Sequence, residues 1–490
     1  MLIIATISSD LILKSQKVRR NFQRVLTNNI RQSFKENKVV YELSLDLGHL
    51  FIHSEDPKAI KLLQRIFGLE YLSLVELECA SDIKVIAEEG YNFYKERVKE
   101  GSYCVRTKRK GKHDFTSEEV NYEFGGRLKH NKNHVSIKNP DVLIQVYIKD
   151  EKAYFFTKKI KAEGGLPLGS GGKALCLMSG GFDSPLASWM LQKRGVQVHY
   201  LFCNLGGKAY ERSTLEIAKK LVDLWGAGSA PSFYTMDFEP IIKEIKEKVK
   251  PAFSQVVLKK FFYKAAENLC FNKKFDAIIT GEAIGQVSSQ TLKNLRAIET
   301  GTNIPVLRPL IAYNKNEIIA TCQRIGTYEL SGKVKEFCQL TKEKPVTATR
   351  ADLLEREFTQ IDFTKIRKEV FSQVKKINLK ELDLTESIEE FLTTETITEN
   401  CTIFDCRTME EYQNKPYEGI PHKEPYAFEN LKSFSKDETY VLFCESNTQS
   451  LVLAEKMQKN GLTAYSLKSG TKGLQRYLST RKEQTIKTRH

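Results

Sequence analysis

This 490-residue chain lacks three features that would each place it in a common class of protein. Its ten cysteines form no Cys-x-x-Cys pair, which argues against a zinc ribbon or an iron–sulfur cluster and favours free thiols in a reducing cytoplasm. No membrane-spanning run is present: residues 1–13 are apolar but too short, and Ser8-Ser9-Asp10 interrupts them. Because no cleavage signature follows, these residues predict a first strand rather than a signal peptide. There is no internal repeat either, so several unlike domains are expected.

The composition is that of a folded protein with an excess of positive charge. Hydrophobic residues make up 41% and charged residues 28%, which is ordinary for a globular chain. A length of 490 residues is too great for one core, so three or four domains are expected. The 76 basic and 61 acidic residues give a net charge of +15. Because the basic residues gather in the N-terminal third, we expect a polyanionic partner.

Two clusters of basic residues lie in this N-terminal third. The first belongs to a predicted helix over residues 18–34 and the segment just before it. The second places five cations in residues 106–112, between a predicted strand at 103–105 and a helix that begins near Thr116. Like charges this close repel unless phosphates screen them, so RNA is favoured over a merely solvated face. The candidate RNA-binding residues are Lys14, Arg19, Arg20, Arg106, Lys108, Arg109, Lys110 and Lys112.

Alternating strand and helix patterns divide the first two thirds of the chain. Residues 1–57 and 58–162 are each typical of a small α+β domain. A linker at 163–172, with five glycines in ten residues, marks a boundary. A βαβ rhythm follows over residues 173–385 and predicts a doubly wound parallel sheet with ligands at the carboxyl ends of its strands.

The last third is predicted to hold a connector and one more domain. Residues 351–392 are charged and helical in pattern. Residues 394–490 predict a final α/β unit, with strands at 402–404 and 439–443.

The most informative motif is Ser179-Gly180-Gly181-Phe182-Asp183-Ser184, between the apolar run 174–178 and the helix-forming residues 185–193. Its glycines let backbone N–H groups approach an anion, which the positive end of a helix dipole favours. No Lys-Ser/Thr closes the loop, so it is not a Walker P-loop, and no third glycine completes G-x-G-x-x-G. The pattern is typical of the pyrophosphate loop of enzymes that adenylate a substrate with ATP. An ordinary strand-to-helix turn is the alternative.

A second loop, residues 280–291, also follows an apolar strand and supplies glycines, hydroxyls and amides. It is expected to face the first loop across the strand ends and to hold the nucleoside side of ATP. A purely structural turn is the alternative.

Two of the cysteines stand apart from the apolar patterns. Cys444 ends the predicted strand 439–443, and a helix follows its loop. Backbone N–H groups and a helix dipole there stabilise an anionic sulfur, either a thiolate or a persulfide. Cys338 lies in the polar segment 335–340. The cysteines expected to be packed in the core are Cys176, Cys203 and Cys270.

Taken together, these motifs resemble the tRNA uridine 4-sulfurtransferase (4-thiouridine synthetase) family, in its long form with a C-terminal rhodanese domain. The resemblance covers the whole chain: Leu13-Lys14-Ser15 with Val18-Arg19, residues 101–128, Asn204-Leu205-Gly206-Gly207, residues 280–291 and Leu307-Arg308-Pro309-Leu310. It implies an α/β multidomain fold with a ferredoxin-like domain (1–57), a THUMP RNA-binding domain (58–162), a PP-loop ATP pyrophosphatase domain (173–385) and a rhodanese-like domain (394–490).

The resemblance also implies the site residues. Asp183 would be essential through Mg²⁺ and the pyrophosphate, Cys444 would carry the persulfide, and Cys338 would form a disulfide with it during turnover. Asp405-Cys406-Arg407 matches the rhodanese D-x-R element. The implied ATP site comprises Leu177, Met178, Ser179, Gly180, Gly181, Asp183, Ser184, Phe202, Cys203, Lys259, Gly281 and Gln290.

One departure concerns the loop after Cys444. A typical rhodanese loop reads C-R-x-G-x-R-S, and here only Cys444 and Ser450 fit. Because Glu445 opposes an anionic sulfur through space, we do not expect free thiosulfate sulfurtransferase activity.

The implied reaction is transfer of sulfur to uridine 8 of tRNA through an adenylated uridine, with ATP and Mg²⁺. A cysteine desulfurase would supply the sulfur. A thiamine-pathway sulfur-carrier protein is a second acceptor to expect. The alternatives are a chain that acts mainly on that carrier, and an RNA-binding module with a degenerate sulfurtransferase tail.

Overall fold

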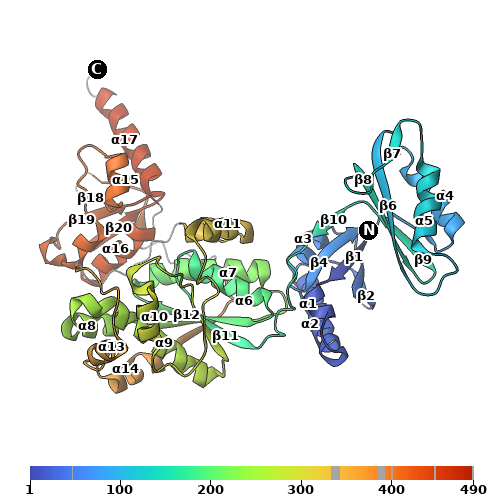
Figure 1. Cartoon of the computed structure of the whole chain (residues 1–490). Coiled ribbons are helices and arrows are strands. Elements are labelled where there is room, and N and C mark those ends of the chain that lie inside the picture. Colours follow the sequence, from blue (N-terminus) through green and yellow to red (C-terminus); the bar gives the residue numbers. More distant parts are fainter. Residues whose placement is uncertain (47, 333–342, 385–391, 399–400, 446–447, 488–490) are drawn as a thin grey trace. The chain divides into compact units, whose positions relative to one another are not determined.

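The computed structural model describes residues 1–46, 48–332, 343–384, 392–398, 401–445 and 448–487 (Figure 1). The chain forms two compact units. The N-terminal unit is residues 1–170 with 193–195, and the C-terminal unit is residues 171–192 with 196–490. Each unit contains two β-sheets covered by helices, so four sheets organise the described chain. No helix of the described ranges is long and apolar enough to cross a membrane.

The first sheet begins with the strand expected at the N-terminus, β1 (Leu2–Ile7). Its five strands run in the order β10-β4-β1-β3-β2 and pair antiparallel. The other four are β2 (Glu42–Asp46), β3 (His49–His53), β4 (Leu69–Leu74) and β10 (Lys159–Lys161). Strands β4 and β10 lie beyond residue 57, where we expected this unit to end. Leu69 and Leu72 of β4 are buried against β1, and a local strand pattern does not reveal which sheet a strand will join.

Helices complete the first sheet. They are α1 (Ser9–Ile12), α2 (Gln16–Glu36) and α3 (Lys58–Gln64). The long helix α2 spans the predicted helix 18–34 and buries Leu26, Ile30 and Phe34, one stripe at helical spacing. Its opposite face is left for polar and basic side chains.

The second sheet runs in the order β5-β9-β8-β6-β7 and is covered by two helices. Its elements are β5 (Leu77–Ala80), α4 (Ile83–Tyr94), β6 (Gly101–Lys110), α5 (Ser117–Leu128), β7 (Asn133–Val135), β8 (Val142–Lys149) and β9 (Lys152–Phe156). Helix α5 begins where the sequence predicts, because Thr116 and Glu119 form a capping box. The core between this sheet and its two helices contains Tyr94, Phe124 and Phe155, which are all fully buried.

Strand β6 is longer than predicted. The sequence predicted a strand over residues 103–105 and placed the basic cluster between it and the next helix. In the structure β6 continues to Lys110 and pairs residue by residue with β8 as far as Lys149. Pairing with β8 satisfies the backbone of the basic segment, which the charge pattern alone does not reveal. Four of the five cations of 106–112 therefore lie on a strand.

The third sheet has the order β15-β14-β11-β12-β13-β16. Its parallel strands are β11 (Lys173–Leu177), β12 (Gln197–Asn204), β13 (Ser232–Asp237), β14 (Ala277–Ile279) and β15 (Val306–Leu307). This is the doubly wound sheet that the βαβ rhythm predicts. The chain runs outward from β11 to β13 and then returns to β14 on the other side of β11. The strand order therefore reverses between β11 and β14, where such sheets bind ligands.

The segment 351–392 is only partly the helical connector we expected. Helices α13 (Ala351–Phe358) and α14 (Phe363–Glu369) are present, but β16 (Lys375–Asn378) follows and pairs antiparallel with β13. Its Lys-Lys pair suits a sheet edge, where charged residues prevent further pairing. The strand is short and charged, so its sequence does not resemble a core strand.

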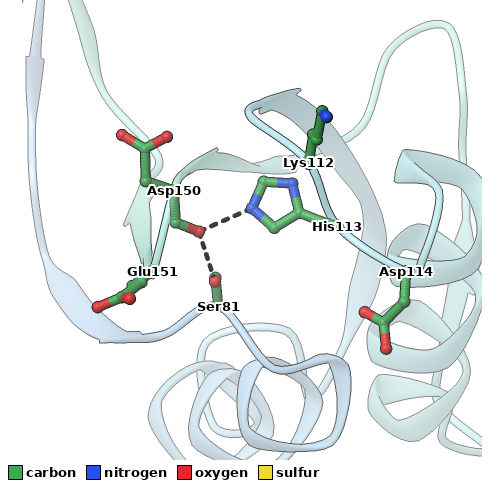
Figure 2. Close-up of a pocket in the computed structure, with 6 residues that line it drawn as sticks. All are labelled: Ser81, Lys112, His113, Asp114, Asp150 and Glu151. Atoms are coloured by element: carbon green, nitrogen blue, oxygen red, sulfur yellow. Dashed lines mark hydrogen bonds between the residues drawn. The ribbon is translucent and has the colours of Figure 1, made fainter.

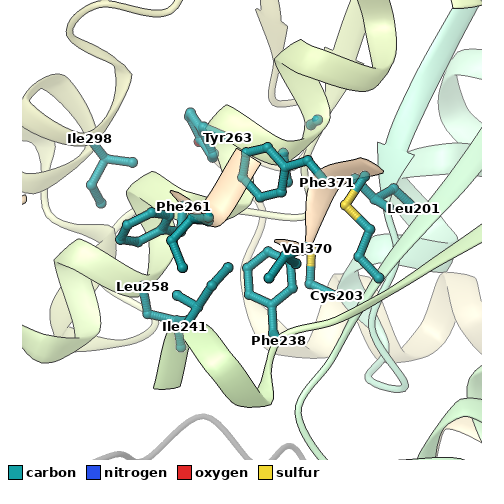
Figure 3. Close-up of a cluster of buried hydrophobic side chains, with 14 of the residues drawn as sticks. Leu201, Cys203, Phe238, Ile241, Leu258, Phe261, Tyr263, Ile298, Val370 and Phe371 are labelled. Atoms are coloured by element: carbon teal, nitrogen blue, oxygen red, sulfur yellow. The ribbon is translucent and has the colours of Figure 1, made fainter. Parts of the chain in front are cut away.

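Helices pack on both faces of this third sheet. They are α6 (Asp183–Lys193), α7 (Gly207–Trp225), α8 (Glu239–Lys248), α9 (Ser254–Lys273), α10 (Leu292–Glu299), α11 (Lys315–Ile325) and α12 (Tyr328–Ser331). On one side an aromatic core joins α8, α9 and the connector (Figure 3). There the rings of Phe261 and Phe358 lie 4.6 Å apart, and Phe238 and Phe371 stack at 6.5 Å.

The fourth sheet is parallel and runs in the order β17-β20-β19-β18. Its strands are β17 (Thr393–Thr394), β18 (Cys401–Asp405), β19 (Thr439–Phe443) and β20 (Thr463–Leu467), and its helices are α15 (Met409–Asn414), α16 (Thr448–Lys459) and α17 (Gly470–Lys487). Both predicted strands, 402–404 and 439–443, are present.

Candidate functional site

The two predicted nucleotide loops lie on either side of the point where the strand order of the third sheet reverses. The loop 179–184 follows β11, and the loop 280–291 follows β14, the neighbouring parallel strand. Carboxyl ends of parallel strands share one edge of a sheet, so the loops are neighbours. Their contact is direct: a Cβ added to Gly281 would lie 2.6 Å from the backbone nitrogen of Ser184.

Hydrogen bonds fix the first loop onto the start of α6. The Ser184 hydroxyl accepts from the backbone N–H of Ser179 at 2.8 Å, and the two hydroxyl oxygens lie 3.1 Å apart. Helix α6 begins at Asp183, so the N–H groups of its first turn have no acceptor within the helix. These N–H groups and the helix dipole favour an anion at this position.

Asp183 is held by two side chains from other elements. The Gln286 amide donates to Oδ2 at 2.9 Å, and the Lys315 ammonium donates to Oδ1 at 3.0 Å. Lys315 also lies over the ring of Phe182, 5.3 Å from its centre. Sequence reasoning included Gln286 only within the loop motif and missed Lys315. No local signal marks Lys315, because only the fold brings the start of α11 to this loop.

A buried carboxylate, Glu282, lies next to Gly281. It receives hydrogen bonds from Tyr263 at 2.5 Å, Thr280 at 3.0 Å and Arg308 at 3.0 Å, and Lys259 lies 3.5 Å from its other oxygen. Burial alone would raise the pKa of Glu282, but the charges of Lys259 and Arg308 and the bond from Tyr263 hold it below its ordinary value. The predicted phosphate ligand Lys259 is thus anchored beside the second loop by an ionised partner.

The other predicted nucleotide residues are buried or structural. Met178, Phe202 and Cys203 are buried, which is compatible with the backbone contacts to ATP that the family resemblance implies for them and for Leu177. The Gln290 side chain accepts from the N–H of Ala283 at 3.4 Å and closes the second loop on itself. Leu177 ends β11 and packs against the aromatic core.

Cys444 lies at the predicted position, directly after β19. Its sulfur accepts from the backbone N–H of Ser450 at 3.4 Å and lies 3.4 Å from the Ser450 hydroxyl, so the first turn of α16 contacts it. The thiol is 2% exposed. Glu445 is exposed and accepts from the Thr471 hydroxyl at 3.3 Å. Cys338 lies outside the described residues.

The Asp405-Cys406-Arg407 segment forms a buried ion pair after β18. The Arg407 guanidinium binds Asp405 at 2.6 Å and donates to the carbonyls of Glu411 and Lys415 at 3.1 and 2.7 Å. Both side chains of the pair are buried. The pair fastens the end of β18 to α15. The three cysteines expected in the core, Cys176, Cys203 and Cys270, are all buried.

The predicted RNA-binding residues lie in two places: on α2 and the turn before it, and on β6 and the turn after it. Lys14, Arg20, Arg106, Lys108 and Lys112 are exposed, whereas Arg19, Arg109 and Lys110 are half-buried. Three cations of the second basic cluster, residues 106–112, have partners within the protein. Lys110 pairs with Asp46, Arg106 donates to the carbonyl of Ile137 at 2.7 Å, and Arg109 donates to that of His113 at 3.3 Å. Lys108 and Lys112 are the exposed cations of this cluster that take part in none of the described hydrogen bonds or ion pairs.

A surface pocket of about 610 Å³ lies at the tip of β6, in the N-terminal unit (Figure 2). Its lining residues are Ser81, Lys112, His113, Asp114, Asp150 and Glu151. The His113 ring and the Ser81 hydroxyl both bind the carbonyl of Asp150, at 2.7 and 2.6 Å. Three carboxylates oppose the two basic side chains, so the pocket does not suit a phosphate. The anion-binding geometry lies at the loop after β11.

A dedicated metal cage is absent from the described residues, since no three His, Cys, Asp or Glu side chains there form a cluster that could hold an ion. Asp183 nevertheless supplies a hard carboxylate at the loop. Mg²⁺ binds nucleotides through one or two carboxylates, phosphate oxygens and water rather than through an all-protein cage. The residues therefore fit a Mg²⁺ ion that arrives with a nucleotide.

Comparison with known proteins matches the chain along its length. Residues 169–363 match the thiamine biosynthesis protein (ThiI) family, residues 80–158 the THUMP domain, and residues 6–73 the ThiI ferredoxin-like domain. A tRNA sulfurtransferase of Desulfurococcus amylolyticus is 33% identical over 95% of this chain and 97% of its own length. A tRNA sulfurtransferase of Haemophilus influenzae is 34% identical over 94% of this chain and 98% of its own length.

A solved structure agrees with these relatives. A 4-thiouridine synthetase in complex with RNA and bound ATP superposes with a TM-score of 0.67 at 27% identity, covering 77% of this chain and 98% of that one. The predicted fold class is confirmed in its ferredoxin-like, THUMP and PP-loop parts.

Proposed function

The chain belongs to the tRNA sulfurtransferase family, and from this premise we propose that it transfers sulfur from a persulfide on Cys444 to uridine 8 of tRNA, giving 4-thiouridine through an adenylated uridine. The chain is an ATP-dependent tRNA sulfurtransferase. The observation that carries the site assignment is the loop 179–184 at the start of α6, with Asp183 held between Gln286 and Lys315.

Adenylation comes first because the carbonyl oxygen of uridine is a poor leaving group. ATP bound at this loop supplies the AMP group that activates that oxygen. The loop N–H groups and the Lys259 ammonium stabilise the phosphate charge, and Asp183 offers its carboxylate to Mg²⁺. Gln286 and Lys315 orient that carboxylate before the nucleotide arrives, so little reorganisation is needed.

Sulfur transfer follows. Cys444 receives the terminal sulfur from a cysteine desulfurase, and the N–H of Ser450 with the start of α16 stabilises the anionic persulfide. In one route Cys338 attacks this persulfide and frees sulfide. In the other the persulfide attacks the activated carbon and Cys338 then resolves it. Both routes end in a Cys338–Cys444 disulfide that needs a reductant. The parallel sheet around Cys444 supports assigning residues 394–490 as a rhodanese-like domain.

A second acceptor is a sulfur-carrier protein of thiamine synthesis, whose C-terminal carboxylate would be adenylated at the same loop. The match of residues 169–363 to a thiamine biosynthesis family favours this role. Both acceptors use the same loop and the same cysteine.

The test is 4-thiouridine formation on unmodified tRNA with ATP, Mg²⁺, a cysteine desulfurase and cysteine. Cys444→Ser should abolish the product, whereas Cys401→Ser, on the neighbouring strand β18, should retain it. Product that survives in Cys444→Ser would mean that free sulfide is the donor. If the wild type forms no 4-thiouridine but does form thiocarboxylate on the carrier protein, the carrier protein is the acceptor.

A further inference from the structure

A second thiol lies beside Cys444 in the fourth sheet. Cys406 directly follows β18 and Cys444 directly follows β19, and these strands run parallel with Asp405 paired to Phe443. The N–H of Cys406 donates to the carbonyl of Phe443 at 2.8 Å, which continues the ladder to the two cysteines. Neighbouring strands lie about 4.8 Å apart, and disulfides join Cα atoms about 4.4–6.8 Å apart. The two backbones are therefore close enough for a bridge.

The two cysteine side chains share one face of the sheet. Alternate residues of a strand point to the same face. Tyr440 and Leu442 of β19 pack in the same apolar cluster as Cys406, and Cys444 is the next residue of that series. Helix α16 covers this face, since Leu453 belongs to the same cluster and Ser450 binds the Cys444 sulfur.

Burial and nearby charge determine the protonation of the Cys406 thiol. Cys406 is fully buried. Burial raises the pKa of its thiol well above the ordinary value, and the nearby charges of Cys444 and Asp405 raise it further. Cys406 therefore keeps its proton in the folded chain. A protonated thiol beside an anionic persulfide has a proton to give to a departing sulfur.

We propose that Cys406 is a resolving thiol for the Cys444 persulfide within the fourth sheet, a role that rests on the persulfide of the proposed function. In this step the Cys406 proton passes to the terminal sulfur of the persulfide, and the resulting Cys406 thiolate attacks the Cys444 sulfur. A bond forms between the two cysteine sulfurs, and the bond between Cys444 and its terminal sulfur breaks. The terminal sulfur leaves with the Cys406 proton as HS⁻. A dithiol reductant then supplies two electrons and two protons and restores both thiols. This route releases sulfide without Cys338.

The experiment uses the full chain with Cys338→Ala, charged with sulfur by a cysteine desulfurase and then freed of cysteine by gel filtration. Released sulfide is measured, and unreduced peptides are mapped by mass spectrometry. Sulfide and a Cys406–Cys444 linked peptide should appear in equal amounts. Cys406→Ala and Cys406→Ser should each slow sulfide release at least tenfold. Cys401→Ala is the matched control, because Cys401 lies on the same strand but packs on the opposite face.

Two outcomes would overturn the proposal. The first is a Cys444 persulfide that decays at the same rate with and without Cys406. The second concerns the resting protein with Cys338→Ala, treated with the thiol oxidant diamide, which needs no persulfide. A Cys406–Cys444 disulfide there supports the pairing even if Cys444 accepts no sulfur, a result that would count against the proposed function alone. If no Cys406–Cys444 disulfide forms in protein whose thermal unfolding is unchanged, the proposed pairing of Cys406 with Cys444 is wrong.

Discussion

Asp183 is the side chain on which the nucleotide loop most depends, because three elements meet at its carboxylate. We predict that Asp183→Asn lowers tRNA-dependent AMP formation at least about 100-fold, or roughly 2.7 kcal/mol of transition-state stabilisation. The amide keeps the shape of the side chain but loses the charge that would hold Mg²⁺ in the proposed function. Asp352→Asn is the control, since Asp352 is 57% exposed and pairs only with Arg350 among the described ion pairs. If Asp183→Asn forms AMP at the wild-type rate, Asp183 has no role in the nucleotide site.

Gly281 is glycine because the two loops touch there. Its Cβ would lie 2.6 Å from the Ser184 nitrogen and 2.7 Å from the Asp183 carbonyl carbon, both rigid backbone atoms. We predict that Gly281→Ala displaces the first loop and lowers kcat/KM for ATP at least about tenfold, since misplaced groups lose effective concentration. Thermal unfolding should change little, because the clash is local. If Gly281→Ala leaves kcat/KM for ATP unchanged, the two loops accommodate the added methyl group without losing their binding geometry.

His199 predicts a dependence of stability on pH. Burial, and then the charges of Lys173 and Lys376, lower its pKa from 6.5 to about 4. The unfolded chain binds a proton before the folded chain does, so stability is complete above pH 6.5 and falls as the pH drops toward 4. We expect a loss of roughly 2–3 kcal/mol across that window.

Urea unfolding at several pH values tests this expectation. In the wild type the N–H of Ser232 donates to His199 Nδ1 at 3.1 Å. His199→Gln should flatten the pH dependence of stability between pH 6.5 and 4, because glutamine still offers an acceptor to this N–H but does not titrate. His53→Asn, at an exposed histidine of β3, should leave the profile unchanged. An unaltered profile in His199→Gln would assign the acid sensitivity to other groups.

Helix α7 begins at two glycines and takes its cap from another element. Gly206 is the N-cap and has no side chain, and the Glu455 carboxylate of α16 accepts from the N–H groups of Lys208 and Ala209, both at 2.9 Å. A side chain at Gly207 would collide with that carboxylate, because its Cβ would lie 2.8 Å from Glu455. One carboxylate thus stabilises the start of α7 and joins it to α16.

Removing this cap should destabilise the C-terminal unit. We predict that Glu455→Ala lowers the free energy of unfolding by about 1–2 kcal/mol and that Glu455→Gln loses less, because the amide oxygen still accepts but lacks charge. Urea unfolding measures both. Glu418→Ala, at an exposed position of the same unit, should change the free energy by less than about 0.5 kcal/mol. Equal stability of Glu455→Ala and wild type would contradict the capping role.

Strand β6 shows how pairing changes the meaning of a charged segment. The predicted strand ended before residues 106–110, yet β8 supplies a partner for each of them. Lys110 and Lys149 then reach the same carboxylate, Asp46 of β2. That pairing uses part of the local charge, so the cations left for RNA are fewer than the sequence suggests.

The net charge of +15 attracts RNA, but the salt dependence of binding reports only the cations that contact phosphates. We predict that tRNA binding weakens linearly in a plot of log Kd against log salt concentration. Replacing Lys108 and Lys112 together by alanine should reduce the slope by roughly 1.4–1.8, the contribution of two phosphate contacts. The double variant Lys436→Ala/Lys472→Ala removes the same charge from exposed sites of the C-terminal unit and should leave the slope unchanged. Equal slopes in both double variants would mean that binding follows net charge alone.

The sequence predicted several elements because their signals are local. The apolar run 174–178, the loop 179–184 and the helix start near Thr116 each depend on neighbours within a few residues: apolar side chains, glycines with hydroxyls, or a capping box. The same holds for Cys444, which lies where a strand meets a helix. Family resemblance extended these motifs to the full order of domains.

What the sequence alone determined is therefore the set of elements and the chemistry of the loops, because backbone propensity and anion binding act over short distances. Only the tertiary structure decided that β4 joins the first sheet, that β16 closes the third, and that Lys315 reaches Asp183. It also decided that Cys406 stands beside Cys444. Each of these depends on strand order and packing between residues distant in the chain, and no local pattern records them.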